Sequence, residues 1–380
     1  MRRPSNQITL PLLTALVALV AVPAAPATAT PERRAGREAK LQSALDRVVA
    51  AGVPGAVLLV RERDRTIRLT SGHGNLKPKT PMRASDRFRV GSVTKTFVAT
   101  VVLQLVGERK LALEDTVDRW LPGVVPNGAQ ITLRQLLNHT SGLFAYGGDP
   151  GFVAAAFRDP LRVWTPREIV AIAMAHPPHF APGAGWSYSD TNYFVLGLIV
   201  EAATGRSLAS ELRRRISAPL RLRATSLPTA PRIAGRHAHG YFLRPLQDVS
   251  VGSPSVDWAA GGVVSTADDL AGFFRALLSG RLLRSDLLRL MRTTVAAPQL
   301  GPGNAYGLGL QKVPAPCGAL WGHTGASPGF VAHALNGKDG RRQVVVLVNA
   351  TSTLSAVGFF GLPMRAGRAV DRLVHAAYCR

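Results

Sequence analysis

The chain has 380 residues and is strongly basic, with 46 Lys and Arg against 23 Asp and Glu and a formal net charge of +23. The arginines are scattered, and neither a basic tail nor a zinc pattern accompanies them, so the charge does not indicate a nucleic-acid-binding protein. An anionic cell wall is a more natural partner for a protein with this positive charge, but charge alone identifies no function.

The first 29 residues have the pattern of a signal peptide. Two arginines form a basic start, residues 8–22 are apolar, and Ala27-Thr28-Ala29 supplies the small residues that a signal peptidase requires. The apolar run is too short to span a membrane comfortably, and no cysteine near the cleavage site could carry a lipid anchor. We therefore expect residues 30–380 to be secreted, associated with the cell wall without a membrane anchor, and folded as one domain.

Helical and extended patterns follow one another in a definite order along this mature chain. They predict a helix over 36–52, strands over 55–60 and 66–71, a long apolar helix over 93–107, a mainly helical region over about 115–220, a helix over 267–279, strands over 307–313, 320–324, 330–336 and 343–349, and a final helix over 364–378. Strands thus flank a helical centre. We expect an α/β protein of the α+β type, in which an antiparallel sheet flanked by helices is built from both chain ends (about 36–90 and 300–380) and a helical region (about 91–299) is inserted.

The sequence has two cysteines, Cys317 and Cys379. In an exported protein an isolated pair of cysteines is usually a disulfide rather than a metal or redox site. We expect a bridge that ties the last helix back to the strands near Cys317.

A serine and a lysine three residues apart stand at the start of the long apolar helix, in Ser92-Val93-Thr94-Lys95. Positions i and i+3 share one helical face, so the ammonium can reach the hydroxyl. The start of a helix also favours a developing negative charge. A lysine on so apolar a helix needs a dedicated partner. We interpret the pair as an activated nucleophile; the alternative is a capping serine followed by a surface lysine.

Two later segments carry polar groups beside predicted helices and strands. Tyr188-Ser189-Asp190 lies in a polar aromatic loop just before an apolar helix, and alone it would be interpreted as a helix cap. His323-Thr324-Gly325 follows a short strand, where the glycine would let a ligand approach the backbone closely. A histidine there would, by itself, more often be structural.

Taken together and in this order, the three segments resemble the serine penicillin-recognising superfamily, which carries Ser-x-x-Lys, Tyr-x-Asn and Lys/His-Thr-Gly. This superfamily includes DD-peptidases, class C β-lactamases and related esterases of one fold. The histidine of the third segment and the cysteine pair around it look most like secreted D-alanyl-D-alanine carboxypeptidases. Further similar stretches lie at 88–95, 136–143, 260–266 and 306–310, so the resemblance covers about 40–378.

The resemblance implies a role for each residue of these segments. Ser92 is the expected nucleophile, and Lys95 and Tyr188 share the proton transfers. The backbone N–H groups of Ser92 and Ala326 form the oxyanion hole. Substrate contacts are expected from Asp190, His323, Thr324 and Gly325, of which the histidine and the threonine line the pocket and help hold the terminal carboxylate of the substrate.

Two positions depart from the superfamily pattern. Asp190 stands where asparagine is usual, and its charge would hold Lys95 protonated, which makes Tyr188 the better candidate for the base. An arginine that binds the substrate carboxylate in such carboxypeptidases is also missing, since Gln311 and Lys312 follow the Gly-Leu-Gly-Leu stretch. A strict preference for a free C-terminal D-alanine is therefore not implied.

A second class of serine hydrolase fits the sequence less well. The segment 325–329, Gly-Ala-Ser-Pro-Gly, matches the nucleophile elbow of α/β-hydrolases around Ser327. That elbow must be followed by a helix and, further along, by an acid and a histidine. Here Pro328 indicates a turn before a strand, and the downstream candidates are cramped, so we reject this interpretation.

Metal enzymes and non-enzymatic binding proteins are the remaining alternatives. The close histidine pairs are His176 with His179 and His237 with His239, and we see neither helical ligand spacing nor a partnering acid for them. We expect no metal and no cofactor. A binding protein that kept the fold would have lost a residue of the catalytic segments, and none is lost.

These patterns predict a serine D-Ala-D-Ala carboxypeptidase that acts on peptidoglycan stem peptides or related small D-amino-acid peptides, and acts as a transpeptidase when another amine accepts the acyl group. The alternative is an esterase, D-amino-acid amidase or β-lactamase of the same superfamily, because all of these share the acyl-enzyme step and differ in pocket shape and water access. We expect β-lactams to be covalent inhibitors, and the protein to be a monomer with no nucleic-acid partner.

Overall fold

The structure is a computed structural model that describes residues 31–63, 65–352 and 361–379. The expected signal peptide and its cleavage site lie outside the described residues. Within those ranges, no helix is both long enough and apolar enough to cross a membrane.

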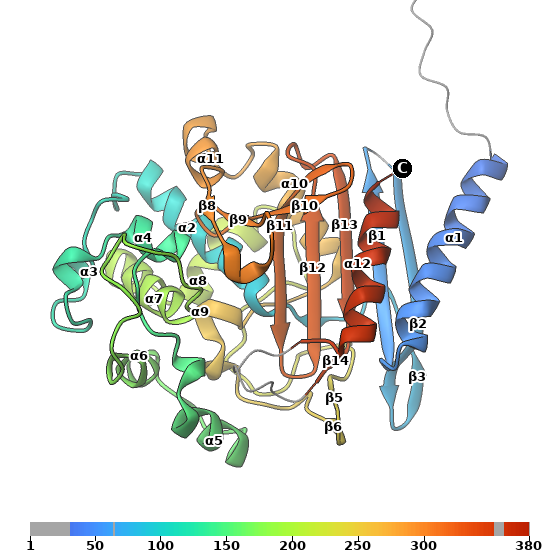
Figure 1. Ribbon diagram of the computed structural model, residues 1–380, viewed down its shortest axis with the longest axis horizontal. Coiled ribbons are helices and arrows are strands. Elements are labelled where there is room, and N and C mark those ends of the chain that lie inside the picture. Colours follow the sequence, from blue (N-terminus) through green and yellow to red (C-terminus); the bar gives the residue numbers. More distant parts are fainter. Residues whose placement is uncertain (1–30, 64, 353–360, 380) are drawn as a thin grey trace, which may run out of the picture.

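The largest element of the described part of the chain is a nine-stranded antiparallel sheet built from both chain ends (Figure 1). Its strands are β1 (Gly55–Glu62), β2 (Arg65–Leu76), β3 (Lys79–Pro81), β8 (Val295–Ala296), β9 (Ala305–Tyr306), β10 (Gln311–Ala315), β11 (Gly318–Ser327), β12 (Phe330–Asn336) and β13 (Arg342–Val348), in the order β3-β2-β1-β13-β12-β11-β10-β9-β8. The two chain ends meet where β1 pairs with β13, from Ala56 opposite Val348 to Glu62 opposite Arg342. The predicted fold class, an antiparallel sheet flanked by helices, is confirmed.

Alternate residues of the central strands face two separate hydrophobic cores, as the two-residue period of a strand requires. On β1, Leu58 lies in the core beneath α1 (Pro31–Ala50) and α12 (Met364–Tyr378), whereas Leu59 lies in the core on the opposite face, with α10 (Ala267–Leu278). Because both faces are buried, the central strands are almost continuously apolar. Figure 1 shows α1 and α12 side by side over one face of the sheet.

The helical region lies beside the other end of the sheet and is organised around two buried helices (Figure 1). Its helices are α2 (Thr94–Gly107), α3 (Val117–Trp120), α4 (Leu133–Asn138), α5 (Pro150–Arg158), α6 (Pro166–Met174), α7 (Thr191–Thr204), α8 (Leu208–Leu212), α9 (Trp258–Gly261) and α11 (Ser285–Met291). Helices α2 and α7 are buried over most of their length and contact each other. This burial explains why both sequences are apolar on all sides.

Two small sheets connect the helical region to the large one. Strand β4 (Phe88–Arg89) pairs with β7 (Val264–Ser265), which brings the segment before α2 against the segment after α9. Strands β5 (Tyr241–Leu243), β6 (Leu246–Asp248) and β14 (Ala350–Thr351) form the second small sheet. These strands of two or three residues carry too little periodic pattern to be predicted from the sequence.

Two elements of the large sheet differ from their predicted bounds. The strand expected from residue 307 begins only at Gln311, because Gly309 has a φ of +72° and packs against α2, where a Cβ atom would lie 2.4 Å from that of Ala99. Strand β11, expected to end at Thr324, continues to Ser327. The extension makes the His-Thr-Gly segment and Ala326 part of a strand rather than of a loop.

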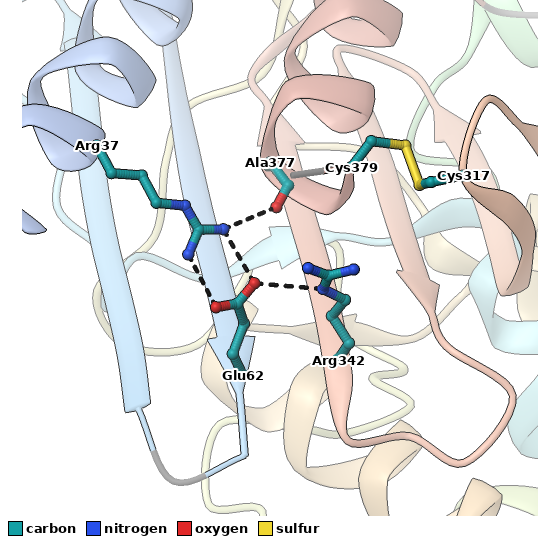
Figure 2. The surroundings of a disulfide bond; sticks show 6 residues. All are labelled: Arg37, Glu62, Cys317, Arg342, Ala377 and Cys379. Atoms are coloured by element: carbon teal, nitrogen blue, oxygen red, sulfur yellow. Dashed lines mark hydrogen bonds and ion pairs between the residues drawn. A yellow bond between two sulfur atoms is a disulfide. The ribbon is translucent and has the colours of Figure 1, made fainter. Parts of the chain in front are cut away.

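The ends of the described chain are tied together by a disulfide and an ion-pair network (Figure 2). Cys317, between β10 and β11, is bonded to Cys379, which follows α12. Nearby, Glu62 accepts hydrogen bonds from Arg37 of α1 at 2.8 and 3.0 Å and from Arg342 of β13 at 3.2 Å. Arg37 also donates to the Ala377 carbonyl of α12 at 3.3 Å, so α1, β1, β13 and α12 are linked at one point.

Candidate active site

Ser92 lies in a single 3-10 turn, η1 (Gly91–Val93), which joins β4 to α2. Gly91 has a φ of +51° and faces β11, where a Cβ atom would lie 2.4 Å from the Ala326 carbonyl oxygen. Only glycine permits both the backbone conformation and this close approach. The glycine before the serine therefore sets the serine directly against the end of β11.

Lys95 lies one helical turn after Ser92, and its side chain is fully buried. Its ammonium donates to Ser92 Oγ at 3.0 Å, to Asp190 Oδ1 at 2.5 Å and to the Ala260 carbonyl oxygen at 2.9 Å. The dedicated partner that a lysine on this apolar helix requires is thus Asp190, together with the backbone of α9.

Tyr188 and Asp190 stand immediately before α7, at the end of that helix that faces the start of α2. The Lys95 ammonium lies 4.9 Å from the centre of the Tyr188 ring, and the phenol hydroxyl hydrogen-bonds with Lys95 and Ser92. The structure therefore brings together the four polar residues that the sequence placed in its first two segments.

The electrostatics of this group hold both candidate bases in their protonated forms. Burial opposes the charge of Lys95, but Asp190 and Tyr188 outweigh burial and raise the pKa of the lysine above its ordinary value. Burial also raises the pKa of the Tyr188 phenol, with Asp190 acting in the same direction, and the opposing influence of Lys95 does not reverse it. Lys95 therefore does not depress the phenol pKa below its ordinary value in the free enzyme.

Strand β11 passes directly over the Ser92 turn. A Cβ atom at Gly325 would lie 2.1 Å from the Val90 carbonyl oxygen and 2.8 Å from the Ser92 nitrogen. The close neighbour that requires this glycine is therefore the Ser92 turn itself, rather than a ligand as the sequence suggested. The contact holds Ala326, the next residue of the strand, beside Ser92, where the two backbone N–H groups are expected to form the oxyanion hole.

Thr324 lines the same cavity as Ser92 but is engaged by a neighbour. Its backbone N–H and its hydroxyl both donate to Gln311 Oε1, at 3.0 and 3.2 Å. A hydroxyl that donates to Gln311 cannot at the same time donate to a substrate carboxylate.

His323 does not line the cavity, and the expectation that it does is wrong. Its imidazole is fully buried, with Nε2 2.8 Å from the hydroxyl of the buried Tyr306, whose ring packs edge-on against that of Tyr188, and Nδ1 2.5 Å from the Thr324 carbonyl oxygen. Burial, and then the charge of Lys95, lower its pKa to about 3, so the ring is neutral. A buried neutral histidine whose two nitrogens have protein partners contributes to the site by supporting its neighbours, here the strand and Tyr306, which packs against the Tyr188 ring.

A cavity of about 710 Å³ opens in front of Ser92. We call one group of its lining residues, most of them polar, the inner wall: Arg89, Ser92, Tyr188, Asp190, Asp257, Thr324, Gly325, Ala326 and Ser327. We call an apolar group of its lining residues the outer wall: Phe152, Val153, Phe157, Phe242, Val249 and Val251. The site can therefore hold a reacting polar group against Ser92 while an apolar part of the same molecule rests on the outer wall.

His139 is a residue of the site that the sequence analysis did not single out. It is fully buried at the end of α4, its ring centre lies 4.3 Å from that of Tyr188, and its Nδ1 accepts a hydrogen bond from the Ser189 N–H at 3.2 Å. Burial, then the charge of Lys95, hold its pKa well below the ordinary value. Its only sequence signal was its place in the superfamily-like stretch 136–143.

Asp257 is a second residue that the sequence analysis missed, and it accounts for Ser327. The Ser327 hydroxyl donates to Asp257 Oδ2 at 2.6 Å, at the point where β11 turns back into β12. Because a strand and not a helix follows Ser327, the nucleophile elbow of the α/β-hydrolases is absent here. Asp257 directly precedes α9, and nothing in the sequence linked it to the catalytic segments.

The two histidine pairs lie apart from Ser92 and have acid partners that the sequence did not reveal. His176 Nε2 lies 2.7 Å from Asp149, and His239 Nδ1 lies 2.7 Å from Asp248. Across the described residues, no group of three or more histidine, cysteine, aspartate or glutamate side chains gathers as metal ligands would.

Comparisons with known proteins agree with this geometry. A family model described as Beta-lactamase matches residues 39–358. A penicillin-binding protein of Bacillus subtilis (strain 168) is 28% identical over 316 residues, which cover 78% of this chain and 68% of the relative.

Two solved structures are similar over most of their length. A D-stereospecific amidohydrolase from Streptomyces sp. has 40% identity and a TM-score of 0.80, covering 90% of this chain and 98% of the other. The D-amino acid amidase of Ochrobactrum anthropi SV3, in complex with D-phenylalanine, has 29% identity and a TM-score of 0.80 over 90% and 98% of the two chains. The family match over most of the chain, together with the Ser-x-x-Lys geometry, makes the protein a serine hydrolase of the beta-lactamase family, within the superfamily that also contains the penicillin-binding proteins.

Proposed function

We propose that the protein hydrolyses amides and short peptides of D-amino acids through an acyl-enzyme on Ser92. The observation that carries this proposal is the state of the two residues expected to hold a substrate carboxylate. His323 is fully buried with both ring nitrogens engaged, and Thr324 already donates to Gln311. A carboxypeptidase needs donors for a free carboxylate, whereas an amidase needs none. The similarity to a D-stereospecific amidohydrolase and to a D-amino acid amidase supports the same choice and the D configuration.

Acylation starts with attack of Ser92 Oγ on the carbonyl carbon of the substrate. The reactive form is the one in which Tyr188 has lost its proton to solvent; an O–C bond forms as the hydroxyl proton of Ser92 passes to this phenolate, which is positioned by its hydrogen bonds with Ser92 and Lys95. Lys95 stays charged beside Asp190 and stabilises the Tyr188 phenolate before the proton transfer neutralises it. The N–H groups of Ser92 and Ala326 hold the carbonyl oxygen as it becomes negative.

The tetrahedral intermediate collapses when the C–N bond breaks. Tyr188 then returns its proton to the departing nitrogen, which leaves as an amine or as ammonia. In deacylation a water molecule attacks the ester, Tyr188 again takes and returns the proton, and the D-amino acid leaves as its carboxylate. The apolar outer wall formed by Phe152, Phe157 and Phe242 is suited to an apolar side chain on the substrate.

D-Ala-D-Ala carboxypeptidase activity is the second candidate function. The observation in its favour is that Arg89 lines the cavity and carries a charge of the right sign for a carboxylate. Its Nη2 group, however, donates to the carbonyl oxygens of Pro231 and Gly252 at 2.8 and 3.0 Å. Only its remaining N–H groups are available to a ligand.

We also propose that the protein acts outside the cell, on D-amino-acid compounds released from or attached to the cell wall. The signal-peptide pattern of the first 29 residues and the Cys317–Cys379 disulfide support this location. Amino-terminal sequencing of the protein recovered from the medium of an expressing culture should start at Thr30.

The function is tested by steady-state rates on five substrates side by side. These are D-phenylalanine p-nitroanilide, its L enantiomer, an N-acetylated D-Ala-D-Ala peptide, a p-nitrophenyl ester and a cephalosporin. We expect the D-anilide to have a higher kcat/KM than its enantiomer and than the peptide. A higher kcat/KM on the N-acetylated peptide would favour the carboxypeptidase instead.

A further inference from the structure

We propose that Asp257 binds the α-ammonium group of the substrate, so that the enzyme selects D-amino acid amides and peptides with a free amino terminus. The inference rests on the proposed function and names the part of the substrate that the cavity recognises. It is carried by the position of Asp257, by its lack of an ion pair within the described residues, and by the chemistry of an amino-acid amide.

Asp257 is connected to both sides of the reaction centre. It lies three residues before Ala260, whose carbonyl oxygen accepts a hydrogen bond from the Lys95 ammonium. Its Oδ2 accepts a hydrogen bond from the hydroxyl of Ser327, the residue after Ala326. Asp257 and Ser92 line the same cavity. In an amino-acid amide the ammonium is attached to the carbon next to the scissile carbonyl. A group that binds the ammonium must therefore lie on the wall of the cavity that contains the nucleophile, and Asp257 lines that cavity.

Unlike Asp190, the other acid of the inner wall, Asp257 forms no ion pair within the described residues; burial raises its pKa, and the charges of Arg89 and Lys95 oppose that rise from beyond ion-pair distance. Asp190 forms an ion pair with Lys95 at 2.5 Å. Among the described residues, no lysine, arginine or histidine nitrogen lies within 4.0 Å of the Asp257 carboxylate, and its only side-chain hydrogen bond is the one from Ser327. Oδ1 accepts no hydrogen bond from a described residue. A substrate ammonium would form the ion pair that Asp257 lacks and would donate a hydrogen bond to Oδ1.

A purely structural role for Asp257 makes a different prediction. If the residue only fastened the end of β11 to α9 through Ser327, an asparagine would serve nearly as well, because its carbonyl oxygen can accept the same hydrogen bond. Binding of an ammonium, in contrast, depends on the negative charge. The Asp257→Asn substitution therefore separates the two roles.

The experiment compares D-phenylalanine p-nitroanilide with its des-amino analogue, 3-phenylpropanoyl p-nitroanilide, in each enzyme preparation. The ratio of the two kcat/KM values does not depend on how much of the preparation is folded. We expect Asp257→Asn to lower this ratio by about 10- to 100-fold, the usual effect of a hydrogen bond to a charged group. Most of the loss should appear as a higher KM for the free-amine substrate.

Asp248→Asn is the matched control, since it removes the same charge from another acid that lines the cavity and is already paired with His239 at 2.7 Å. We expect it to leave the ratio within about threefold of wild type. An equal fall in the control would assign the effect to the general field of the cavity and overturn the inference. An unchanged ratio in Asp257→Asn would also overturn it, while wild-type hydrolysis of the D-anilide would leave the proposed function standing. If wild type itself hydrolyses only N-acylated peptides, the proposed function and the inference are both wrong.

Discussion

Replacement of Asp190 by asparagine tests the electrostatic account of the site. Acylation requires that Tyr188 or Lys95 lose its proton, and the pKa values of both groups are raised, with Asp190 acting upward on each. The rate should therefore increase with pH through neutrality into the alkaline range. Removing the carboxylate lowers both pKa values, so the rising limb of the pH profile should move to lower pH.

The size of the shift follows from the distance between Lys95 Nζ and Asp190 Oδ1, which is 2.5 Å. Coulomb's law gives about 1.7 kcal/mol at this distance in the dielectric of water and about 7 kcal/mol at an effective dielectric constant near 20. One pKa unit corresponds to about 1.4 kcal/mol. We expect the limb to move by about 1–3 pH units, the usual range for a charge beside a carboxylate.

The assay is kcat/KM for D-phenylalanine p-nitroanilide between pH 5 and 10, because the profile of kcat/KM reports the pKa values of the free enzyme. Asparagine keeps an oxygen that can accept a hydrogen bond from the Lys95 ammonium, so Asp190→Asn should retain substantial activity. Asp286→Asn, on the exposed surface of α11, changes the net charge equally and should leave the limb in place. If the rising limb of the pH profile is unchanged in Asp190→Asn, or moves to higher pH, the reasoning is refuted.

Three further outcomes are expected. Tyr188→Phe should lower the acylation rate by roughly 10²–10⁴-fold with little change in substrate binding, and near wild-type acylation in stopped-flow measurements would make Lys95 the base. The pKa of His323 is about 3 in the folded protein, against an ordinary value of 6.5, so between these pH values the histidine takes up a proton more readily in the unfolded chain. The free energy of unfolding should therefore fall by up to about 5 kcal/mol as pH falls through this window. Denaturation curves at pH 6.5 and 4.5 should differ less in His323→Gln, and an equal difference would remove this residue as a cause. Replacing Cys317 and Cys379 by alanine opens a cross-link between residues 62 positions apart and should cost about 2–4 kcal/mol in urea unfolding, whereas unchanged unfolding would show that the bridge is not formed.

The parts of the site that could be predicted from the sequence are those set by local geometry. Ser92 and Lys95 are one helical turn apart, and the residues around them are apolar, so the need for a partner was evident. Tyr188 and Asp190 precede a second buried helix in the same way. Each pair lies at the start of a helix that its own sequence defines, and the contact between α2 and α7 then joins the two pairs.

The role of His323 could not be predicted, because it depends on the register of β11 and on a partner far along the chain. The strand was expected to end at Thr324, but it continues to Ser327, and this places His323 on the face where Tyr306 is buried. Asp257 and His139 were missed for a related reason. Each reaches the site only through tertiary packing, Asp257 through Ser327 and His139 through the Tyr188 ring.

The fold was predicted where the hydrophobic runs are long and missed where the elements are short. The central strands β1 and β13 are buried on both faces, so their sequences are continuous apolar runs. Strands β8 and β9 have two residues each, and their pairing is fixed by neighbours rather than by their own pattern. Two residues are too few to show the alternation of side chains that identifies a strand in a sequence.

The central claim, that Ser92 is the nucleophile of a penicillin-recognising serine hydrolase, is tested most directly by intact-protein mass spectrometry after incubation with penicillin. The account predicts an adduct of one equivalent on the wild-type protein and on Ser327→Ala, with the label on the peptide that contains Ser92. It predicts no adduct on Ser92→Ala. Labelling that persists in Ser92→Ala and disappears in Ser327→Ala would contradict the account and assign the nucleophile to the other serine of the cavity.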